Sequence, residues 1–368
     1  MRERSTFSLV HTAVYPNMLF AAVLLLGAPS PGGGSVSELE PPWWSCIKSS
    51  LDADMNFTAG VNNGTDSVQR IHLFMVVGKI MTVVFLGIAI NYINATMIHT
   101  FFSHHIFKMN PRFILFIHLV VNDMIQLITS ISLLILAYTL YTTHVPLCCL
   151  LIIPAVVTTQ NTPLNITFMA VECYIAVCFP LHYNQICTAK KAYIVIGMIW
   201  TMGSLTVLPD VIIFLVTESQ EFMNSRVVCL RDGVFRSAYI LKKQDVSHKV
   251  FLVVVWLTIF YTYFRILLVV KAADAEAKKA RNTLLIHGFQ VLMCMMVYVD
   301  PMLVAVLIKL FPGQFAVLKF FSFILNQILP RCISPVVYGL RDKTFRKYFK
   351  RYLCSVNSHP KISPTGPF

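Results

Sequence analysis

Seven long apolar stretches constrain this chain more than any other feature of its sequence. A helix that crosses the hydrocarbon core of a bilayer needs about 20 mostly apolar residues. The alternating pattern of a membrane β-barrel is absent, so we expect helices. The predicted spans are residues 72–98, 112–138, 147–178, 191–216, 246–270, 282–310 and 316–339. The sequence therefore predicts an all-α fold, a seven-transmembrane helix bundle.

The composition excludes a soluble enzyme. Only 13% of the residues are charged, whereas a soluble domain usually carries about 25%. The formal net charge of +13 comes from basic residues scattered between apolar spans, which is typical of the cytoplasmic loops of a membrane protein rather than of a nucleic-acid-binding patch. We therefore expect membrane lipids, and no nucleic acid, among the partners.

The distribution of charge predicts the orientation in the membrane. Basic residues with few acidic neighbours collect in one set of connections, and the other set balances its basic residues with acids. The positive-inside rule then puts the N-terminus outside the cell and the C-terminus in the cytoplasm of a multi-pass plasma-membrane protein. Glycosylation sequons at Asn56 and Asn63 agree with an extracellular N-terminal segment.

The chain divides into three predicted parts. Residues 1–70 form the extracellular N-terminal segment, residues 71–340 the membrane domain, and residues 341–368 a cytoplasmic helix and tail. The apolar run at 18–28 fits a signal-like segment, while Met55 is an alternative start of the chain. Both interpretations leave the predicted bundle unchanged.

The predicted tail helix is short and amphipathic. Phe345, Tyr348, Phe349 and Tyr352 recur at helical spacing with basic residues between them. Such a helix is expected to lie on the inner leaflet of the membrane. Cys354 follows it, and we interpret this cysteine either as a palmitoylation site or as an unmodified thiol.

Polar and ionisable residues inside the predicted spans need a physical reason, because lipid makes them costly. Asn94 lies in the first span, Asp123 in the second and Glu172 at the end of the third. Asp300 lies in the sixth span, where it is expected either to meet a cationic ligand or to accept a hydrogen bond from a neighbouring helix. His104 and His105 have metal-like spacing by coincidence, and we predict neither a metal site nor a catalytic set.

Three motifs in these spans resemble those of rhodopsin-like G-protein-coupled receptors and, within that class, odorant receptors. The stretch MAVECYIAVCFPLHY resembles the family pattern MAxDRYVAICxPLxY, KARNTLLIH resembles KAxxTCxSH, and SPVVYGLRD resembles NPxIYxLRN. The resemblance covers about residues 70–353 in the family's order. The second span, PRFILFIHLVVNDMIQL, is more similar to fish odorant receptors than to mammalian ones.

The resemblance implies a receptor that binds a small extracellular odorant and signals to a heterotrimeric G protein of the stimulatory, olfactory type. It implies no enzymatic activity and no cofactor. The alternatives are a polytopic transporter or channel, and a divergent receptor with impaired coupling. The implied ligand-binding residues, whose polar members could instead bond neighbouring helices, are Thr159, Gln160, Met295, Tyr298 and Ile324. The implied residues for the switch and for G-protein coupling are Glu172, Cys173, Tyr174, His287, Pro335 and Tyr338.

Two further features follow from the resemblance. The family's extracellular disulfide corresponds to Cys148 and Cys229, with Cys149 as the rival of Cys148. The family's polar core corresponds to Asn94, Asp123, Arg331 and Ser334. Because an arginine cannot neutralise itself by losing its proton, Arg331 is expected to pair with Asp123, or otherwise to bond backbone carbonyls freed by nearby prolines.

The largest departure from the family pattern is Cys173, which stands where the family has arginine. That arginine normally pairs with the acid beside it, so Glu172 is expected to lack its adjacent partner. Coupling to the G protein is then in doubt, and Cys173→Arg is expected to strengthen it.

Overall fold

The structure is a computed structural model, and most of the predicted bundle is described in it. The described residues are 66–140, 142–229, 231–235, 237–270, 289, 292–293, 296, 300, 303–304, 306–311, 314–333 and 345–349.

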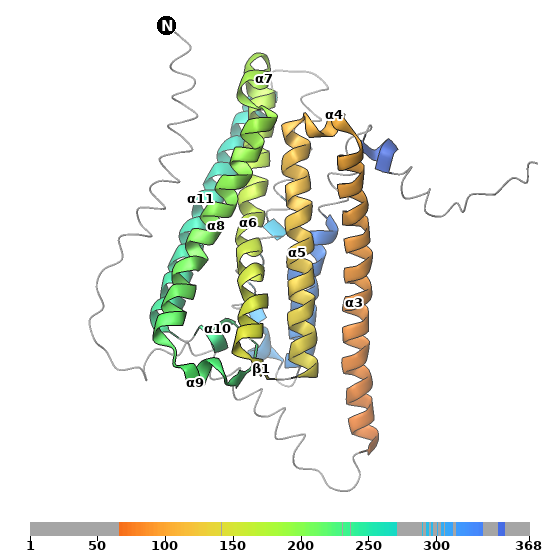
Figure 1. The fold of residues 1–368 in the computed structure, drawn as a ribbon. Helices are drawn as coiled ribbons and strands as arrows, with labels where there is room; N and C mark the ends of the chain where they lie inside the picture. Colours follow the sequence, from red (N-terminus) through yellow and green to blue (C-terminus); the bar gives the residue numbers. More distant parts are fainter. Residues whose placement is uncertain are drawn as a thin grey trace, which may run out of the picture.

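Long helices dominate the described part of the chain (Figure 1). Four of them are long and apolar enough to cross a membrane: α3 (Asp66–Ser103), α5 (Pro111–Thr139), α6 (Val145–Cys178) and α8 (Ala189–Thr217). They are followed by α11 (Ala238–Val270), α13 (Phe315–Phe323) and the π-helical turn η3 (Ile324–Ile328). These helices correspond to the predicted first to fifth spans and to the described part of the seventh. The described positions between 289 and 310, in the sixth, are helical.

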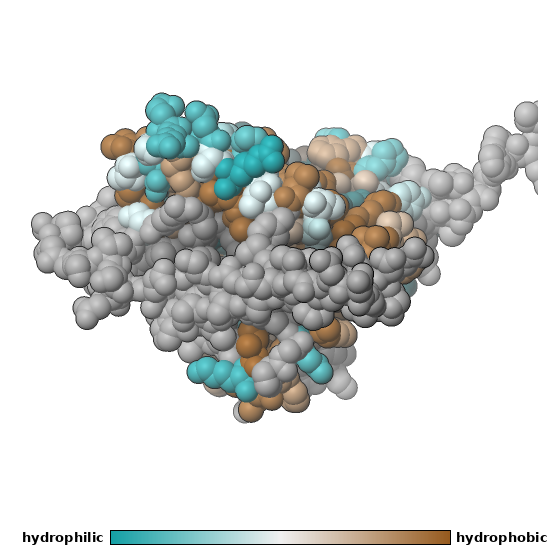
Figure 2. Space-filling model, turned by 90° about the horizontal axis from the view of Figure 1, so that it is seen from below, coloured by the Kyte–Doolittle hydropathy of each residue, from teal (hydrophilic) through white to brown (hydrophobic). Residues whose placement is uncertain are grey.

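Short elements close the two ends of the bundle. We call one the α7 end: it carries α4 (His105–Lys108), η2 (Pro180–His182) and α7 (Tyr183–Ile186). The opposite one, the disulfide end, carries α9 (Gln220–Met223), α10 (Arg231–Val234) and a small antiparallel pair of strands (Figure 1). In this pair, β1 (Thr143–His144) lies against β2 (Arg226–Val227), with Thr143 opposite Val227. Seen from the disulfide end, hydrophilic residues lie beside hydrophobic ones (Figure 2).

Helix α6 is the central element, because it contacts α5, α8 and α11. Its polar segment, residues 158–165, is buried except at Thr159, as the cost of polar groups in lipid requires. Asn122 of α5 donates from Nδ2 to the Thr158 carbonyl and to the Thr162 hydroxyl, each at 2.9 Å. Asn165 donates from Nδ2 to the Leu115 carbonyl at 3.1 Å. Side-chain amides thus join α5 to α6 along their length.

A disulfide joins the start of α6 to the segment after β2. Cys148 and Cys229 are bonded, with their Cα atoms 5.5 Å apart, and Cys149 is a free thiol. The pairing expected from the family is therefore confirmed, and Cys149 does not form this disulfide. Cys148 and Cys229 lie in an apolar cluster with Val145, Phe214 and Phe235.

The tail packs onto the α7 end. Residues 345–349 are helical, and Phe345 and Phe349 are buried in the same cluster as Phe107 and Phe116. The Phe345 ring stacks on Phe113 with a centroid distance of 5.6 Å. The apolar side of this helix therefore faces the bundle, and its position on the inner leaflet stays a prediction. Tyr352 and Cys354 lie outside the described residues.

The disulfide yields a stability prediction with a matched control. Cys148→Ser should lower the thermal stability of the detergent-purified protein by about 2–5 kcal/mol, because the bond closes a loop of 81 residues that the unfolded chain would otherwise leave open. Cys149→Ser should change it little. Thermal melting and surface labelling measure both variants, and an equal loss in the two would contradict the assignment.

Candidate functional site

The α7 end carries a carboxylate that is almost fully buried. Glu172 lies in the last two turns of α6, and its side chain is only 6% exposed. A buried carboxylate is costly unless it is paired and hydrogen-bonded. The Glu172 carboxylate therefore needs a cation and hydrogen-bond donors close to it.

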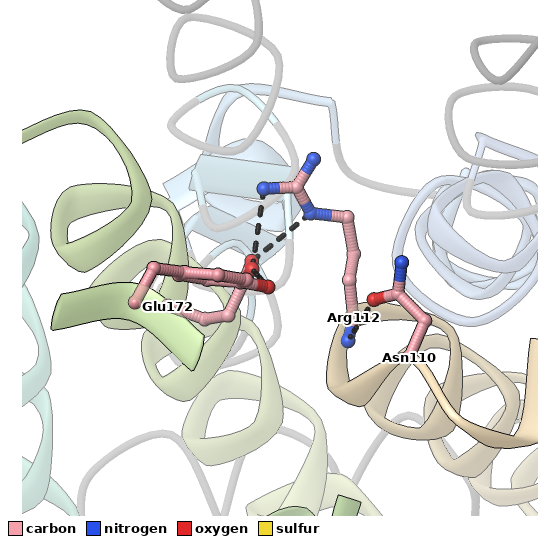
Figure 3. Close-up of polar contacts among 4 residues, drawn as sticks. Asn110, Arg112 and Glu172 are labelled. Carbon is pink, nitrogen blue, oxygen red and sulfur yellow. Dashed lines mark hydrogen bonds and ion pairs between the residues drawn. The ribbon is translucent and has the colours of Figure 1, made fainter. Parts of the chain in front are cut away.

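The cation that meets Glu172 comes from α5 and not from the neighbouring residue. Arg112 Nε lies 3.1 Å from Glu172 Oε2, and Arg112 Nη2 lies 3.2 Å from Oε1 (Figure 3). This bidentate arrangement is the strongest form of the arginine–carboxylate contact. Glu172 has no charged partner in the adjacent position, as the sequence predicts, and its partner stands 60 positions earlier in the chain.

The local sequence explains how Arg112 reaches α6. Pro111 occupies the first turn of α5, where its missing N–H costs nothing. Asn110 caps the helix, and its side-chain oxygen accepts from the Arg112 backbone N–H at 3.1 Å (Figure 3). Because this cap fixes the first turn, it also fixes the direction in which the Arg112 side chain leaves α5.

A third group completes the arrangement. Tyr183, in α7, donates its hydroxyl to Glu172 Oε1 at 2.5 Å. Burial, followed by the negative charge of Glu172, raises the pKa of Tyr183, so its hydroxyl keeps the proton that it donates. Arg112, Glu172 and Tyr183, which we call the α7-end clamp, thus tie α5, α6 and α7 together.

The residue that replaces the family arginine has an apolar environment. Cys173 is 4% exposed and packs with Ile266 of α11, and Tyr174, Val177 and Tyr263 surround this pair. A cation at position 173 would therefore have to displace apolar contacts between α6 and α11. The described residues contain another cation nearby, the Arg265 guanidinium, which lies close to the Tyr174 side chain.

The polar core differs in part from the family-based expectation. Asn94, Asp123 and Arg331 are all buried. The Arg331 guanidinium donates from Nη1 to the Asn326 carbonyl at 2.6 Å, and no ion pair with Asp123 is recorded among the described residues. Arg331 thus takes a backbone carbonyl, which the sequence left as the alternative. The physical reason is Pro330, which stands four positions after Asn326 and has no N–H to donate to the Asn326 carbonyl. Ser334 lies outside the described residues.

A polar cavity lies in the half of the bundle nearer the disulfide end. Its volume is about 180 Å³, and it is lined by Asp300, Lys319, Ser322, Phe323, Asn326 and Gln327. Ser322 donates its hydroxyl to Asp300 Oδ1, and Asn326 Nδ2 donates to Ser322 Oγ at 3.4 Å. The expectation that Asp300 accepts a bond from a neighbouring helix is therefore confirmed.

Of the predicted ligand-binding residues, the three that the structure describes do not line this cavity. Thr159 accepts from Gln126 Nε2 at 2.7 Å, and Gln126 also contacts Gln327. Gln160 accepts from Thr206, so its side chain meets α8. Ile324 packs in an apolar cluster with residues of α3 and α5. Met295, Tyr298, His287, Pro335 and Tyr338 lie outside the described residues.

Sequence reasoning missed two sets of residues. The cavity-lining residues of the seventh span, 319, 322, 326 and 327, follow helical spacing, and that spacing was the available signal. The second is Arg112, the first residue of the predicted span 112–138, to which the sequence analysis gave no role. The absence of a cation beside Glu172 was the available signal, because a buried carboxylate needs a cationic partner from another part of the chain.

A helix bundle with a polar cavity toward one end and a charged clamp at the other fits a membrane receptor of the seven-helix class. The family model described as the 7 transmembrane receptor (rhodopsin family) matches residues 93–338. A protein described as Odorant receptor 131-2 of Danio rerio is 32% identical over 280 residues, which cover 74% of this chain and 85% of that protein. The chain belongs to the rhodopsin family of seven-transmembrane receptors, and it is a multi-pass membrane protein.

The Arg112–Glu172 pair yields a double-mutant prediction. Arg112→Gln and Glu172→Gln should each destabilise the purified receptor by roughly 1–3 kcal/mol, because each leaves a charged group without its bidentate partner. The double variant should lose much less than the sum of the two. Thermal melting measures the cycle, with Lys190→Gln as an exposed control at the same end. Additive losses would show that the two side chains do not interact.

The negative charge of Glu172 leads to a second prediction, which concerns the reactivity of the Cys187 thiol. Burial, then the charge of Glu172, raises the pKa of the Cys187 thiol to about 11. The thiol should therefore react slowly with iodoacetamide at neutral pH, with a rate that rises as the pH approaches that value. In Glu172→Gln the rise should come at lower pH, because a negative charge that opposed the thiolate is gone. Mass spectrometry of the Cys187 peptide follows the reaction, and an unchanged profile would exclude this electrostatic influence.

Proposed function

We propose that this receptor detects a small odorant and signals through a heterotrimeric G protein of the stimulatory, olfactory type. The observation that carries the proposal is the match to the Danio rerio protein, which is described as an odorant receptor. The polar cavity supplies a place for a small molecule, and small-molecule sites between helices of a bundle are common. Binding would act by shifting the population of bundle conformations, without bond chemistry.

The proposed orientation puts the disulfide end outside the cell and the α7 end in the cytoplasm of the plasma membrane. The basic residues of the inner connections and the sequons Asn56 and Asn63 support it. A disulfide is also expected to persist on the oxidising side of the membrane. The odorant would then enter from the side of the cavity, and the G protein would bind near the α7-end clamp.

The proposed ligand site is the cavity together with the residues that the family resemblance implies. Thr159 belongs to it through Gln126 and Gln327. Met295 and Tyr298 remain proposed wall residues. Gln160 and Ile324 are proposed only as supports of that wall, since their recorded contacts are with α8 and with an apolar cluster.

The proposed coupling surface includes Glu172, Tyr174 and the family positions His287, Pro335 and Tyr338. Arg112 performs one part of what an adjacent arginine would do, because it compensates the buried Glu172 carboxylate. We therefore propose that the receptor remains capable of coupling although Cys173 replaces the family arginine.

Cyclic AMP measurements test this function directly. In cells that lack the stimulatory α subunit, an odorant panel should evoke cyclic AMP only when that subunit or its olfactory relative is supplied. A ligand-independent substrate flux with no dependence on a G protein would contradict the proposal and favour a transporter.

Position 173 gives a sharper test of coupling. The sequence alone led us to expect a gain in coupling from Cys173→Arg, and the contacts of Glu172 lead us to replace that expectation. Cys173→Arg should bring no gain in odorant-evoked cyclic AMP at equal surface expression, because Arg112 and Tyr183 already satisfy Glu172 and because Cys173 packs against Ile266. Cys173→Ser serves as a control that changes the residue without adding charge. A large gain from Cys173→Arg alone would show that the absent arginine limits coupling.

A further inference from the structure

The cavity near the disulfide end is lined by two side chains of opposite charge in the sixth and seventh spans. Asp300 and Lys319 both line it. Ionisable side chains inside membrane helices are costly and mark functional sites by default. A carboxylate and an ammonium group on the walls of one small cavity therefore restrict which ligands can fill it.

The hydrogen bonds around Asp300 orient the acidic side of the cavity. Asn326 Nδ2 donates to Ser322, and Ser322 donates to Asp300. With its amide nitrogen used in this way, Asn326 presents its oxygen: Oδ1 is buried and has no hydrogen-bond partner among the described residues. Asp300 and Asn326 thus offer acceptor oxygens, and an ammonium group carries three donors to meet them.

The other lining residues complete the site. Lys319 lies in the second turn of α13 and supplies a cationic donor for a carboxylate. The Gln327 side-chain oxygen accepts from Gln126 and from Ser130, each at 3.4 Å, so contacts from α5 hold its amide in place. Phe323 supplies the apolar part of the wall.

The size of the cavity limits the ligand further. Its volume of about 180 Å³ is below the 300–1,000 Å³ that is usual for drug-sized ligands. A neutral odorant offers a charged group to neither of these side chains. An amine or a carboxylic acid offers an opposite charge to only one of them, whereas a compact zwitterion offers one to each.

We propose that the ligand of this receptor is a compact zwitterion of the α-amino acid type, with its ammonium group at Asp300 and Asn326 and its carboxylate at Lys319. This inference rests on the proposed function, since it names the chemical class of the odorant for the same cavity.

A matched set of probes tests the inference. L-valine carries both charges, 2-methylpropan-1-amine lacks the carboxylate, 3-methylbutanoate lacks the ammonium group, and 2-methylpropan-1-ol is neutral. Glycine and L-alanine extend the set to smaller zwitterions. In cells with the receptor at the surface, one or more of the three amino acids should evoke cyclic AMP at concentrations about tenfold or more below those of the analogues.

Charge-selective variants assign the two ends of the ligand. Lys319→Met should reduce sensitivity to the amino acids and to the acid by about tenfold or more, and should leave the amine little changed. Asp300→Asn should do the reverse. Lys309→Met, an exposed lysine near the same end of the bundle, is the control and should leave all responses unchanged. If the Asp300→Asn variant does not reach the cell surface, the responses of the Lys319→Met variant alone test the proposed ligand.

The outcomes separate this inference from the proposed function. One outcome is a response to the alcohol or other neutral odorants that exceeds the response to amino acids and that Lys319→Met leaves unchanged. This outcome would contradict a zwitterionic ligand but would remain consistent with an odorant receptor. The absence of any response to charged or neutral probes, with the receptor at the surface and the stimulatory α subunit present, would overturn both.

Discussion

The ion pair between Arg112 and Glu172 is the contact on which the α7 end of this receptor depends. Glu172 is buried where α6 ends, and a carboxylate in such a place is stable only with a cation and further hydrogen bonds. Arg112 supplies two bonds from α5, and Tyr183 supplies one from α7. The clamp therefore fixes the relative position of three elements. It does so in a family member whose sequence, with Cys173 beside Glu172, lacks the cation that usually stands there.

Helices α5 and α6 also connect this end to the cavity. Amide side chains join the two helices near their middle, and Gln126 of α5 meets both Thr159 of α6 and Gln327 of the seventh span. A ligand that changes the packing of the seventh span would therefore act on the same two helices that the clamp holds together. In this account, a population shift of the bundle links the two ends, and the clamp contributes to the stability of the resting conformation.

The sequence predicted the features that depend on local pattern. Long apolar runs located the spans, and the family spacing identified Cys148 and Cys229 as partners. Contacts between residues far apart in the chain could not be predicted from such patterns. Gln160 was expected at the ligand by its depth alone, but depth does not determine the helix face, and its side chain meets α8. The partner of Glu172 stands on another helix, so no adjacent motif could name it. Arg331 bonds the carbonyl of Asn326, which lies in a π-helical turn that the sequence pattern does not predict.

An experimental structure of the ligand-free receptor in a lipid environment, at a resolution that places side chains, tests the central claim most directly. The account predicts that the Arg112 guanidinium contacts both oxygens of the Glu172 carboxylate at about 3.1–3.2 Å, with the Tyr183 hydroxyl on Oε1. A structure in which Arg112 turns to solvent, with its guanidinium well beyond about 4 Å from the carboxylate, would contradict it.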